Sequence, residues 1–374
     1  MSSVLHEPRL KILHLIHVLG ETNSQYNEHA LPAMHARDIS ICTYFKPRLE
    51  YPSEITVFHG DDTLRGFFRA LRAALDAKDY DAIHAHSPQT VFLLTLALIA
   101  RPRYFKLWRS TVFTAHDSFY DFKPRNKLLM FPAFAAFRRV VFCGKAAYAS
   151  FPASWRRIVG RRARVVQNSA DLDRVERASA GVERGGSDSM FTVVSIGRLE
   201  KVKDPETLLT AFEKASDERS RLVLIGAGSL QARLEQHVRS SPAASRIELT
   251  GLIPRVEVFA RCARADLFVS ASLGEGLPVG VMEAMATGCP VVLSDIPPHR
   301  EIVEGVDFVP IVASGDADGF AREIERFRSM PQQERAAIGQ RCRELVRDRF
   351  ALARMQSGYE SVYRELCAGD RSAS

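Results

Sequence analysis

Two glutamates frame an irregular loop in the second half of the chain. Glu275 and Glu283 stand eight positions apart in EGLPVGVMEAMATGCPVV, and the two glycines and one proline between them exclude a regular helix there. The residues VMEAMA then predict a helix start, where free backbone N–H groups and the helix dipole favour an anion such as a diphosphate. Ionised carboxylates accept hydrogen bonds, so Glu283 suits ribose hydroxyls and Glu275 suits the hydroxyls of a sugar beyond the phosphates.

Two cations come earlier in the chain. Arg198 and Lys203 lie five positions apart in GRLEKVKD, directly after the strand-like run FTVVSI. A guanidinium can fork onto phosphate oxygens, and an ammonium adds a point charge. Each of these charges, taken alone, is explained equally well by a surface turn or a helix end. Their combination with the glutamate pair predicts a nucleotide site.

The elements that must position these residues are short apolar strands that alternate with helical patterns, which is typical of an α/β protein with parallel sheets. KILHLI, AIHAH, TVFTAH, FTVVSIG, RLVLIG, DLFVSAS and PVVLSD read as strands, and residues 64–77 read as a helix. Ligands of doubly wound sheets bind beyond the carboxyl ends of the strands. Gly20, His86, His116, Asn168, Arg198, Gly226 and Glu275 all fall at such ends.

The chain has 374 residues, which favours two domains. The stretch 173–190 is polar and lacks apolar periodicity, so it reads as an exposed connection. We therefore expect an N-terminal domain at 1–172, a linker at 173–190, a C-terminal domain at 191–345 and a final helix at 346–374.

The formal net charge is +7, which suits an anionic membrane surface but is equally explained by a solvated, arginine-rich surface. The stretch RPRYFKLWRS (101–110) is basic with interleaved aromatics, and FPASWRRIVGRRAR (151–164) adds further arginines. The six cysteines form no CxxC pair, no histidine group has zinc-ligand spacing, and no signal peptide is evident. We expect a cytoplasmic protein, with peripheral association at the inner face of the membrane as an open alternative, and no nucleic-acid partner.

Three segments together resemble the retaining glycosyltransferases of family 4. EGLPVGVMEAMATGCPVV is similar to the E-x7-E element of that family, GRLEKVKD to its GRLxxxK element, and LVLIGAG to its second-domain strand and glycine turn. The resemblance implies the GT-B fold, in which two Rossmann-like doubly wound domains face each other across a cleft and the C-terminal helix returns to the N-terminal domain. It also implies transfer of a hexose-type sugar from a nucleotide-sugar donor to a glycan or lipid-linked acceptor, in synthesis of a surface polysaccharide or glycoconjugate.

The resemblance also assigns roles to individual residues. Arg198 and Lys203 would hold the diphosphate, Glu283 the ribose and Glu275 the donor sugar. His116, in TAHDSF, matches the position of a functional histidine and would orient the reacting sugar or acceptor. The backbone around the loop would line the sugar and phosphates; these residues are Gly276, Leu277, Pro278, Val279 and Gly280.

No metal and no cofactor beyond the donor are expected. We find no DxD pair that would supply Mg²⁺ in a loop ahead of the site, and Asp61 and Asp62 precede a predicted helix, where capping explains them better. The leaving phosphate would then be stabilised by fixed cations and backbone donors. Because the sequence offers no covalent nucleophile, the resemblance favours attack of the acceptor on the face from which the phosphate departs.

The first domain departs from the family pattern. The region after the first strand, LGETNSQYNEHALP, contains one glycine, Gly20, where the family often has several. Its polar run from Asn23 to Glu28 reads either as an acceptor-binding loop or as a helix start at Asn27. His86 and Asn168 are weaker site candidates than His116, and a satisfied structural role explains each of them well.

Two other functions are compatible with the scaffold. One is a nucleotide-sugar epimerase or hydrolase, and the combination of E-x7-E with GRLxxxK argues against it. The other is a non-catalytic nucleotide-binding protein or a dinucleotide oxidoreductase. For the oxidoreductase, the first strand-to-helix turn lacks GxGxxG, and Gly226 and Gly228 alone are a weak substitute.

Overall fold

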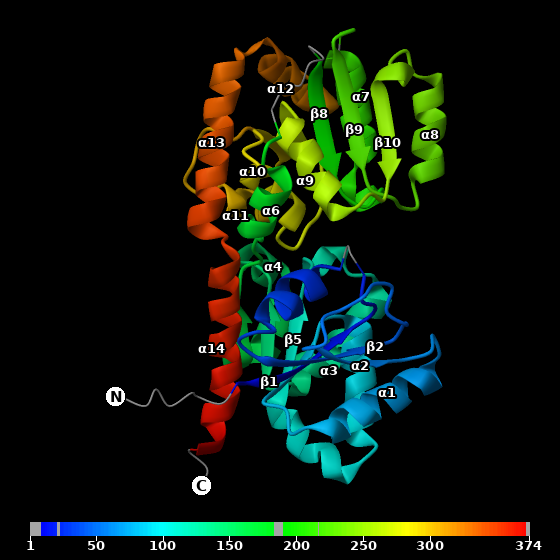
Figure 1. Cartoon of the computed structure of the whole chain (residues 1–374), viewed down its shortest axis with the longest axis vertical. Coiled ribbons are helices and arrows are strands. Elements are labelled where there is room, and N and C mark those ends of the chain that lie inside the picture. The colour runs from blue at the N-terminus through cyan, green and yellow to red at the C-terminus, as the bar shows by residue number, and fades with distance from the viewer. Residues whose placement is uncertain (1–8, 21–22, 183–189, 216, 372–374) are drawn as a thin grey trace. The chain divides into compact units, whose positions relative to one another are not determined.

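The computed structural model describes residues 9–20, 23–182, 190–215 and 217–371. The chain folds into two compact units, each with its own parallel sheet (Figure 1). Unit 1 comprises residues 1–143, 147–166 and 355–374, and unit 2 comprises residues 144–146 and 167–354.

Unit 1 is built on a seven-stranded parallel sheet in the order β3-β2-β1-β4-β5-β6-β7. The strands are β1 (Lys11–Ile16), β2 (Asp38–Thr43), β3 (Thr56–His59), β4 (Ala82–Ala85), β5 (Thr111–Ala115), β6 (Arg139–Phe142) and β7 (Ala163–Val165). The strand order reverses between β1 and β4, so the loops after these two strands flank the position where doubly wound sheets bind ligands.

The connections of unit 1 are helical. They are η1 (Gln25–Ala30), η2 (Leu31–Ala33), α1 (Leu64–Ala77), α2 (Pro88–Ile99), η3 (Pro102–Ser110), η4 (Phe119–Asp121), α3 (Pro124–Ala136), α4 (Lys145–Ser150), α5 (Ala153–Val159) and η5 (Gly160–Arg162). The Thr63 side chain caps α1 by accepting from Gly66 N at 3.0 Å, and Ser87 caps α2. Phe67 and Leu71 of α1 are fully buried in the core.

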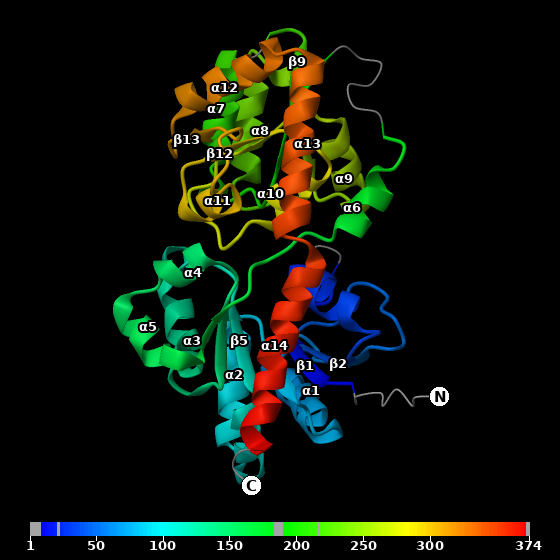
Figure 2. The same cartoon turned by 90° about the vertical axis from the view of Figure 1, so that its left-hand side faces the viewer.

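Helix α14 (Leu352–Arg371) supplies the last element of unit 1 (Figure 2). Its Tyr359 and Tyr363 are almost completely buried. The Tyr363 hydroxyl lies 2.8 Å from His84 Nδ1, and the Tyr359 hydroxyl lies 3.1 Å from Thr114 Oγ1. These hydrogen bonds tie the helix to strands β4 and β5.

Unit 2 contains a six-stranded parallel sheet in the order β10-β9-β8-β11-β12-β13. The strands are β8 (Phe191–Ile196), β9 (Ser220–Ile225), β10 (Ile247–Gly251), β11 (Leu267–Ser270), β12 (Val291–Ser294) and β13 (Ile311–Val312). The helices are α6 (Leu172–Ser179), η6 (Lys201–Lys203), α7 (Pro205–Ala215), α8 (Gln231–Ser240), η7 (Ala244–Arg246), α9 (Arg255–Arg264), α10 (Val279–Ala286), α11 (Pro297–Ile302), α12 (Ala317–Ser329) and α13 (Gln332–Arg349). Here the strand order reverses between β8 and β11.

The stretch 173–190, which was expected to be an exposed linker, is partly helical. Its first part lies in helix α6, which is capped by Asp171 through a 3.0 Å hydrogen bond from Arg174 N and which buries Val175 in unit 2. A single buried residue in a short, mostly charged helix is too weak a pattern to read from sequence. Residues 183–189 of the same stretch lie outside the described residues.

Among the described residues, no helix is both long enough and apolar enough to cross a bilayer. Helix α2, which contains the apolar run VFLLTLALI, has 12 residues.

Candidate functional site

The glycine turn after β9 fixes the loop that carries Arg198. Leu199 N donates to Ala227 O and Gly197 N donates to Ile225 O, both at 3.0 Å. A Cβ on Gly226, where φ is +141°, would lie 2.0 Å from Gly197 O, and one on Gly228 would lie 2.4 Å from Leu199 O. Only glycine permits this close approach of two backbones.

Arg198 and Lys203 lie where the sequence places them, beyond the carboxyl end of β8. A small cavity there is lined by Gly197, Arg198 and Lys203 together with Ser270 and Ser272 from the end of β11. Arg198 is exposed and Lys203 is partly buried. The cavity therefore has cations and hydroxyls at the switch point of the sheet, as an anion site requires.

Lys203 and Glu275 form an ion pair, and Ser272 Oγ donates to the same carboxylate oxygen at 2.8 Å. The side chains are 22% and 11% exposed, respectively. The structure thus brings together two residues that sequence reasoning placed at different parts of the donor. In this arrangement each one fixes the position of the other.

Glu283 lies in the second turn of α10 and is paired with Arg255, the first residue of α9. The Glu283 residue is 6% exposed. Burial raises the pKa of the Glu283 carboxyl above its usual range, although the Arg255 guanidinium opposes this shift. Arg255 was missed by sequence reasoning because nothing local connects it to a carboxylate 28 positions away.

The loop between the two glutamates leads directly into α10. Gly276, Leu277 and Pro278 are buried, whereas Val279 and Gly280 form the partly exposed first turn of the helix. Helix geometry leaves the first backbone N–H groups without intrahelical acceptors. Asn168 Nδ2 donates to Leu277 O at 2.9 Å, so Asn168 holds this loop in place.

His299 is a second residue that sequence reasoning missed. It is fully buried, with Nδ1 2.9 Å from Ser294 O and Nε2 3.3 Å from Ser270 Oγ. Burial lowers its pKa to about 4, although the nearby Glu275 charge opposes the shift. A neutral imidazole therefore lies behind the ion pair of Lys203 and Glu275.

Unit 1 places His116 in a group of buried histidines, here called the histidine cluster. The cluster comes from β1, η1 and the ends of β4 and β5, and its members are His14, His29, His84, His86 and His116. His86 Nε2 lies 2.9 Å from His14 Nδ1, and His86 Nδ1 lies 3.1 Å from His116 Nε2. All five are buried except His116, which is partly exposed.

Burial keeps the histidine cluster neutral. It lowers the pKa of His14 to about 3 and that of His116 to about 4, and it lowers the pKa values of His29, His84 and His86 well below the usual range. The sequence suggested His116 as a site residue and left His86 weaker. The hydrogen bond between them joins the two side chains in one network.

The polar run after β1 forms the helix η1, which begins at Gln25, so the expected start at Asn27 is two residues late. Asn23 Oδ1 accepts from Tyr26 N at 2.8 Å, and Asn27 is buried. Asp61 does not cap α1, because Thr63 does; the Asp61 carboxylate instead accepts from Thr63 Oγ1 at 2.6 Å.

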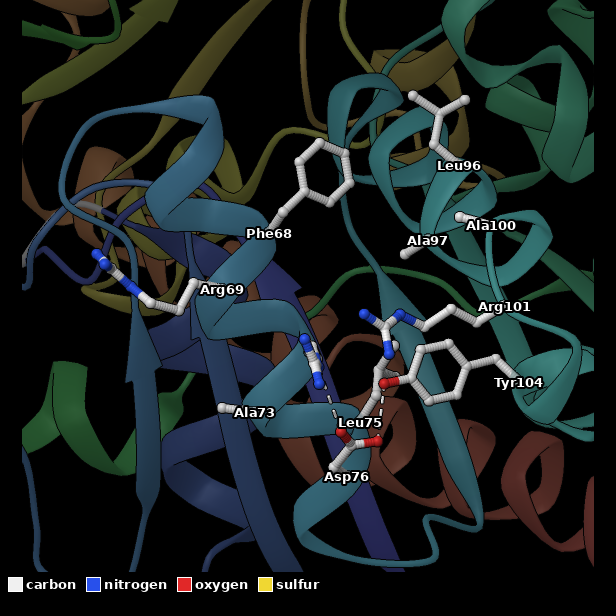
Figure 3. Close-up of a pocket in the computed structure, with 11 residues that line it drawn as sticks. Phe68, Arg69, Ala73, Leu75, Asp76, Leu96, Ala97, Ala100, Arg101 and Tyr104 are labelled. Carbon is white, nitrogen blue, oxygen red and sulfur yellow. Dashed lines mark hydrogen bonds and ion pairs between the residues drawn. The ribbon is translucent and has the colours of Figure 1, made fainter.

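A separate groove of about 590 Å³ lies on unit 1 between α1 and α2, and it contains none of the predicted site residues (Figure 3). One wall carries Phe68 and Leu75 of α1, and the other carries Leu96 and Ala100 at the end of α2. Three arginines contribute to its lining: Arg69, Arg72 and Arg101.

Comparison with known proteins agrees with these features. The family model described as glycosyl transferases group 1 matches residues 184–345, and the model described as Glycosyltransferase Family 4 matches residues 34–174. Together they match most of both units.

Several curated proteins are similar to the chain. The lipopolysaccharide core biosynthesis mannosyltransferase LpcC of Rhizobium leguminosarum bv. viciae is 26% identical over 56% of this chain and 61% of its own length. The putative glycosyltransferase EpsD of Bacillus subtilis is 25% identical over 79% of each chain. The putative colanic acid biosynthesis glycosyltransferase WcaL of Escherichia coli is 30% identical over 42% of this chain and 41% of its own length. The matches thus span between about two fifths and four fifths of these relatives.

Solved structures share the fold. Anabaena HepE in complex with UDP and glucose superposes with a TM-score of 0.75 at 18% identity, over 96% of this chain and 100% of that one. Sucrose-phosphate synthase from Thermosynechococcus elongatus gives a TM-score of 0.78 at 18% identity with the same coverage. These findings confirm the predicted fold class and the family resemblance: the chain belongs to the family 4 type of glycosyltransferases and has the GT-B fold.

Proposed function

We propose that the chain is a retaining glycosyltransferase that moves a hexose-type sugar from a nucleoside-diphosphate sugar to a glycan or lipid-linked acceptor. The observation that carries the proposal is the ion pair of Lys203 and Glu275 at the switch point of unit 2, beside Arg198. In this pair the Lys203 ammonium can bind a phosphate and the Glu275 carboxylate can accept from a sugar hydroxyl. A nucleotide sugar carries these two groups next to each other.

The donor fits unit 2 residue by residue in this proposal. Arg198 and the first N–H groups of α10 hold the diphosphate, and no metal is needed there. The Lys203 ammonium has three donors, so it can keep Glu275 and still donate to a phosphate oxygen. Glu275 accepts from a hydroxyl of the sugar, and Glu283, shared with Arg255, accepts from the ribose.

The chemical step follows from the same residues. The bond between the anomeric carbon and the phosphate breaks, the acceptor oxygen bonds to that carbon on the same face, and the leaving phosphate takes the acceptor proton. Fixed cations stabilise the charge that develops on the phosphate. His116 orients the reacting sugar or the acceptor, and residues 1–172 bind the acceptor.

The relatives suggest the biological product. LpcC, WcaL and EpsD are described by name as transferases, two of them for lipopolysaccharide core and colanic acid. By analogy we propose that this chain acts in the synthesis of a surface polysaccharide or glycoconjugate, at the cytoplasmic face of the membrane.

A surface of unit 1 supports peripheral membrane association. Phe92, Leu96 and Ile99 follow one face of α2 and are 37%, 42% and 59% exposed. Two exposed arginines of α1 line the neighbouring groove: Arg69, which is labelled in Figure 3, and Arg72. Apolar side chains beside cations suit anionic phospholipids.

Two arginines of the stretch 151–164 serve the fold of unit 1 instead of this surface. Arg162 donates to the backbone carbonyls of Phe137 and Ile158, and Arg164 pairs with Glu365. These arginines hold unit 1 together. Lys106 and Arg103 of the stretch 101–110 pair with Asp79 and Asp76, just as Arg69 and Arg72 of the surface pair with Asp61 and Asp76.

The decisive experiment is a thermal-shift panel of UDP, GDP, ADP and their sugars, with and without EDTA. We expect one nucleotide to stabilise the protein, by about 2.7 kcal/mol at a hundredfold excess over Kd, and EDTA to leave the shift unchanged. The Arg198→Ala variant should lose the shift. Arg219→Ala, an exposed arginine at the amino end of β9, is the matched control and should keep it. Absence of any shift would contradict a nucleotide-sugar donor.

Retention is tested on the product, whose anomeric configuration is read by NMR; an inverted product would contradict the proposed step. Membrane association is tested by co-sedimentation with anionic and zwitterionic vesicles. Ile99→Ser should lower binding to anionic vesicles, whereas equal binding of both proteins would exclude α2 as the contact.

A further inference from the structure

The histidine cluster of unit 1 carries buried ring nitrogens that the fold leaves without partners. Within the described part of the chain, His29 Nδ1 and His14 Nε2 have no hydrogen-bond partner and no exposure to solvent. An unsatisfied buried polar atom is costly, so such atoms point to a group that the protein binds. Of the two, His29 Nδ1 belongs to the group of three histidines considered next.

We infer that His29, His86 and His116 form a binding site for a late first-row divalent metal ion, such as Zn²⁺, Co²⁺ or Ni²⁺. Each of the three offers a ring nitrogen within 4.8 Å of the others. The site goes beyond the proposed transfer reaction, with which it shares His116, and it includes none of the residues proposed to hold the diphosphate and the ribose.

The distances suit such an ion. His86 Nδ1 and His116 Nε2 are 3.1 Å apart, whereas two nitrogens of a tetrahedral zinc site lie about 3.3 Å apart if each bond is about 2.05 Å. The ring of His29 lies against both, with centroid distances of 5.0 Å to His86 and 5.5 Å to His116. A small outward shift of the side chains opens the site.

The surroundings orient the ligands. With His86 Nδ1 bound to the metal, its proton resides on Nε2, which lies 2.9 Å from His14 Nδ1 and can donate to it. Such an outer hydrogen bond is the usual support of a metal-bound imidazole. No proton has to leave the protein, because three neutral imidazoles supply three lone pairs.

A second group of histidines is less suitable. His14, His84 and His86 also lie within 4.8 Å of one another. Both nitrogens of His84 are already occupied, by the Tyr363 hydroxyl at 2.8 Å and by Thr114 Oγ1 at 2.7 Å. A metal there would have to break both hydrogen bonds.

Access and charge also favour the first group. His116 is partly exposed, so solvent can supply a fourth ligand and a path of entry. Arg37, a cation whose charge acts on His29, is held by Glu360 at 2.9 Å and by Gln356, so its charge is compensated. The absence of a carboxylate from the set of three excludes the hard cations Mg²⁺ and Ca²⁺.

The test uses full-length protein without a histidine tag. Zn²⁺ affinity is measured by competition with a chromophoric chelator, and Co²⁺ is added to record its visible spectrum. We expect one ion per chain and the spectrum of a nitrogen site of low coordination number. His116→Ala and His29→Ala should each lower Zn²⁺ affinity at least about tenfold, the lower end of what even an outer-shell loss costs. His35→Ala, an exposed histidine of unit 1, should bind as the unmodified protein does.

Several outcomes would overturn the site. These are no binding, binding that neither variant weakens, or an intense thiolate band from Co²⁺ bound to cysteine. If His29→Ala fails to fold, the partly exposed His116 position decides alone. Because no donor or acceptor is present, the result is independent of the transfer activity.

Discussion

The two units place opposite chemistry at the same point of the same topology. In unit 1 the sheet reverses between β1 and β4, and in unit 2 it reverses between β8 and β11. The first point carries neutral imidazoles, with His86 directly after β4. The second carries the ion pair of Lys203 and Glu275. Sheet topology decides where a site lies, and the side chains alone decide whether it is neutral or charged.

The two kinds of site are stabilised differently. Charges in unit 2 tolerate burial because each has an opposite partner, as Glu283 has Arg255. Imidazoles in unit 1 tolerate burial because they give up their charge and share hydrogen bonds. Removing one member should therefore cost more in unit 2 than in unit 1.

The largest effect is expected from Arg255→Ala, which leaves the Glu283 carboxylate buried without its partner. Breaking a buried pair should lower the free energy of unfolding of unit 2 by about 3–5 kcal/mol. Both tryptophans, Trp108 and Trp155, lie in unit 1, so amide hydrogen exchange of α9 and α10 is the measurement for unit 2. Arg264→Ala, an exposed arginine on the same helix, is the control and should change little. Unchanged hydrogen-exchange protection in Arg255→Ala would contradict the claim that the buried charges of unit 2 depend on their ion-pair partners.

The next effect concerns Lys203→Ala, which removes the fixed cation. We expect kcat/KM to fall about 100-fold, as for the loss of one preorganised donor. Lys201→Ala, an exposed lysine of the same short helix η6, should keep nearly full activity. Equal losses in the two variants would mean that general positive charge, and no specific pairing, serves the donor.

His299 sharpens the comparison, since it is a neutral imidazole within the charged unit. Its pKa in the folded protein is about 4, below the ordinary 6.5, so the unfolded chain takes up the proton first as the pH falls. Its contribution to stability is complete above pH 6.5 and is lost between pH 6.5 and 4, by about 2 kcal/mol at pH 5. The measurement is the free energy of unfolding at pH 7 and at pH 5, from denaturant unfolding followed by circular dichroism. Its decrease between the two pH values should be smaller by this amount in His299→Asn than in the unmodified protein. Parallel losses would place the acid sensitivity elsewhere.

The smallest effect is expected for Tyr363→Phe in unit 1. It removes the hydroxyl that pairs with His84 Nδ1 but keeps the packing of the ring. Leaving one buried neutral nitrogen unpaired should cost about 1–2 kcal/mol. Tryptophan fluorescence during denaturant unfolding reports on unit 1 and measures this cost. Tyr120→Phe, at a residue that is 80% exposed, should be neutral. A loss as large as that from Arg255→Ala would erase the distinction between the units.

Much of the fold could be predicted from the sequence because its signals are local. Alternating strands and helices gave the fold class, and residues 64–77 form α1 as expected. Strand β2 was not among the predicted strands: Asp38, Ser40 and Thr43 interrupt its apolar pattern, yet Ser40 and Thr43 are buried. The interior position of β2 between β1 and β3 buries these polar residues, and that position is not visible in a single sequence.

The candidate site was predictable to the extent that its residues share short segments. Arg198 with Lys203, and Glu275 with Glu283, are local pairs. The ion pairs that join them to other segments are not local, and neither is the histidine cluster. His14 and His84 become neighbours only through the register of β1 and β4. The roles of these residues toward a donor and an acceptor remain predictions.

The return of α14 to unit 1 has a consequence for biosynthesis. Unit 1 needs residues 355–371 to cover His84 and Thr114 with Tyr363 and Tyr359. A ribosome makes these residues after all of unit 2, at about 5–20 residues per second. The first unit to be translated is therefore the last to be completed. Until α14 is made, the sheet of unit 1 leaves His84 and Thr114 uncovered. A chaperone would be most useful to the chain during this interval.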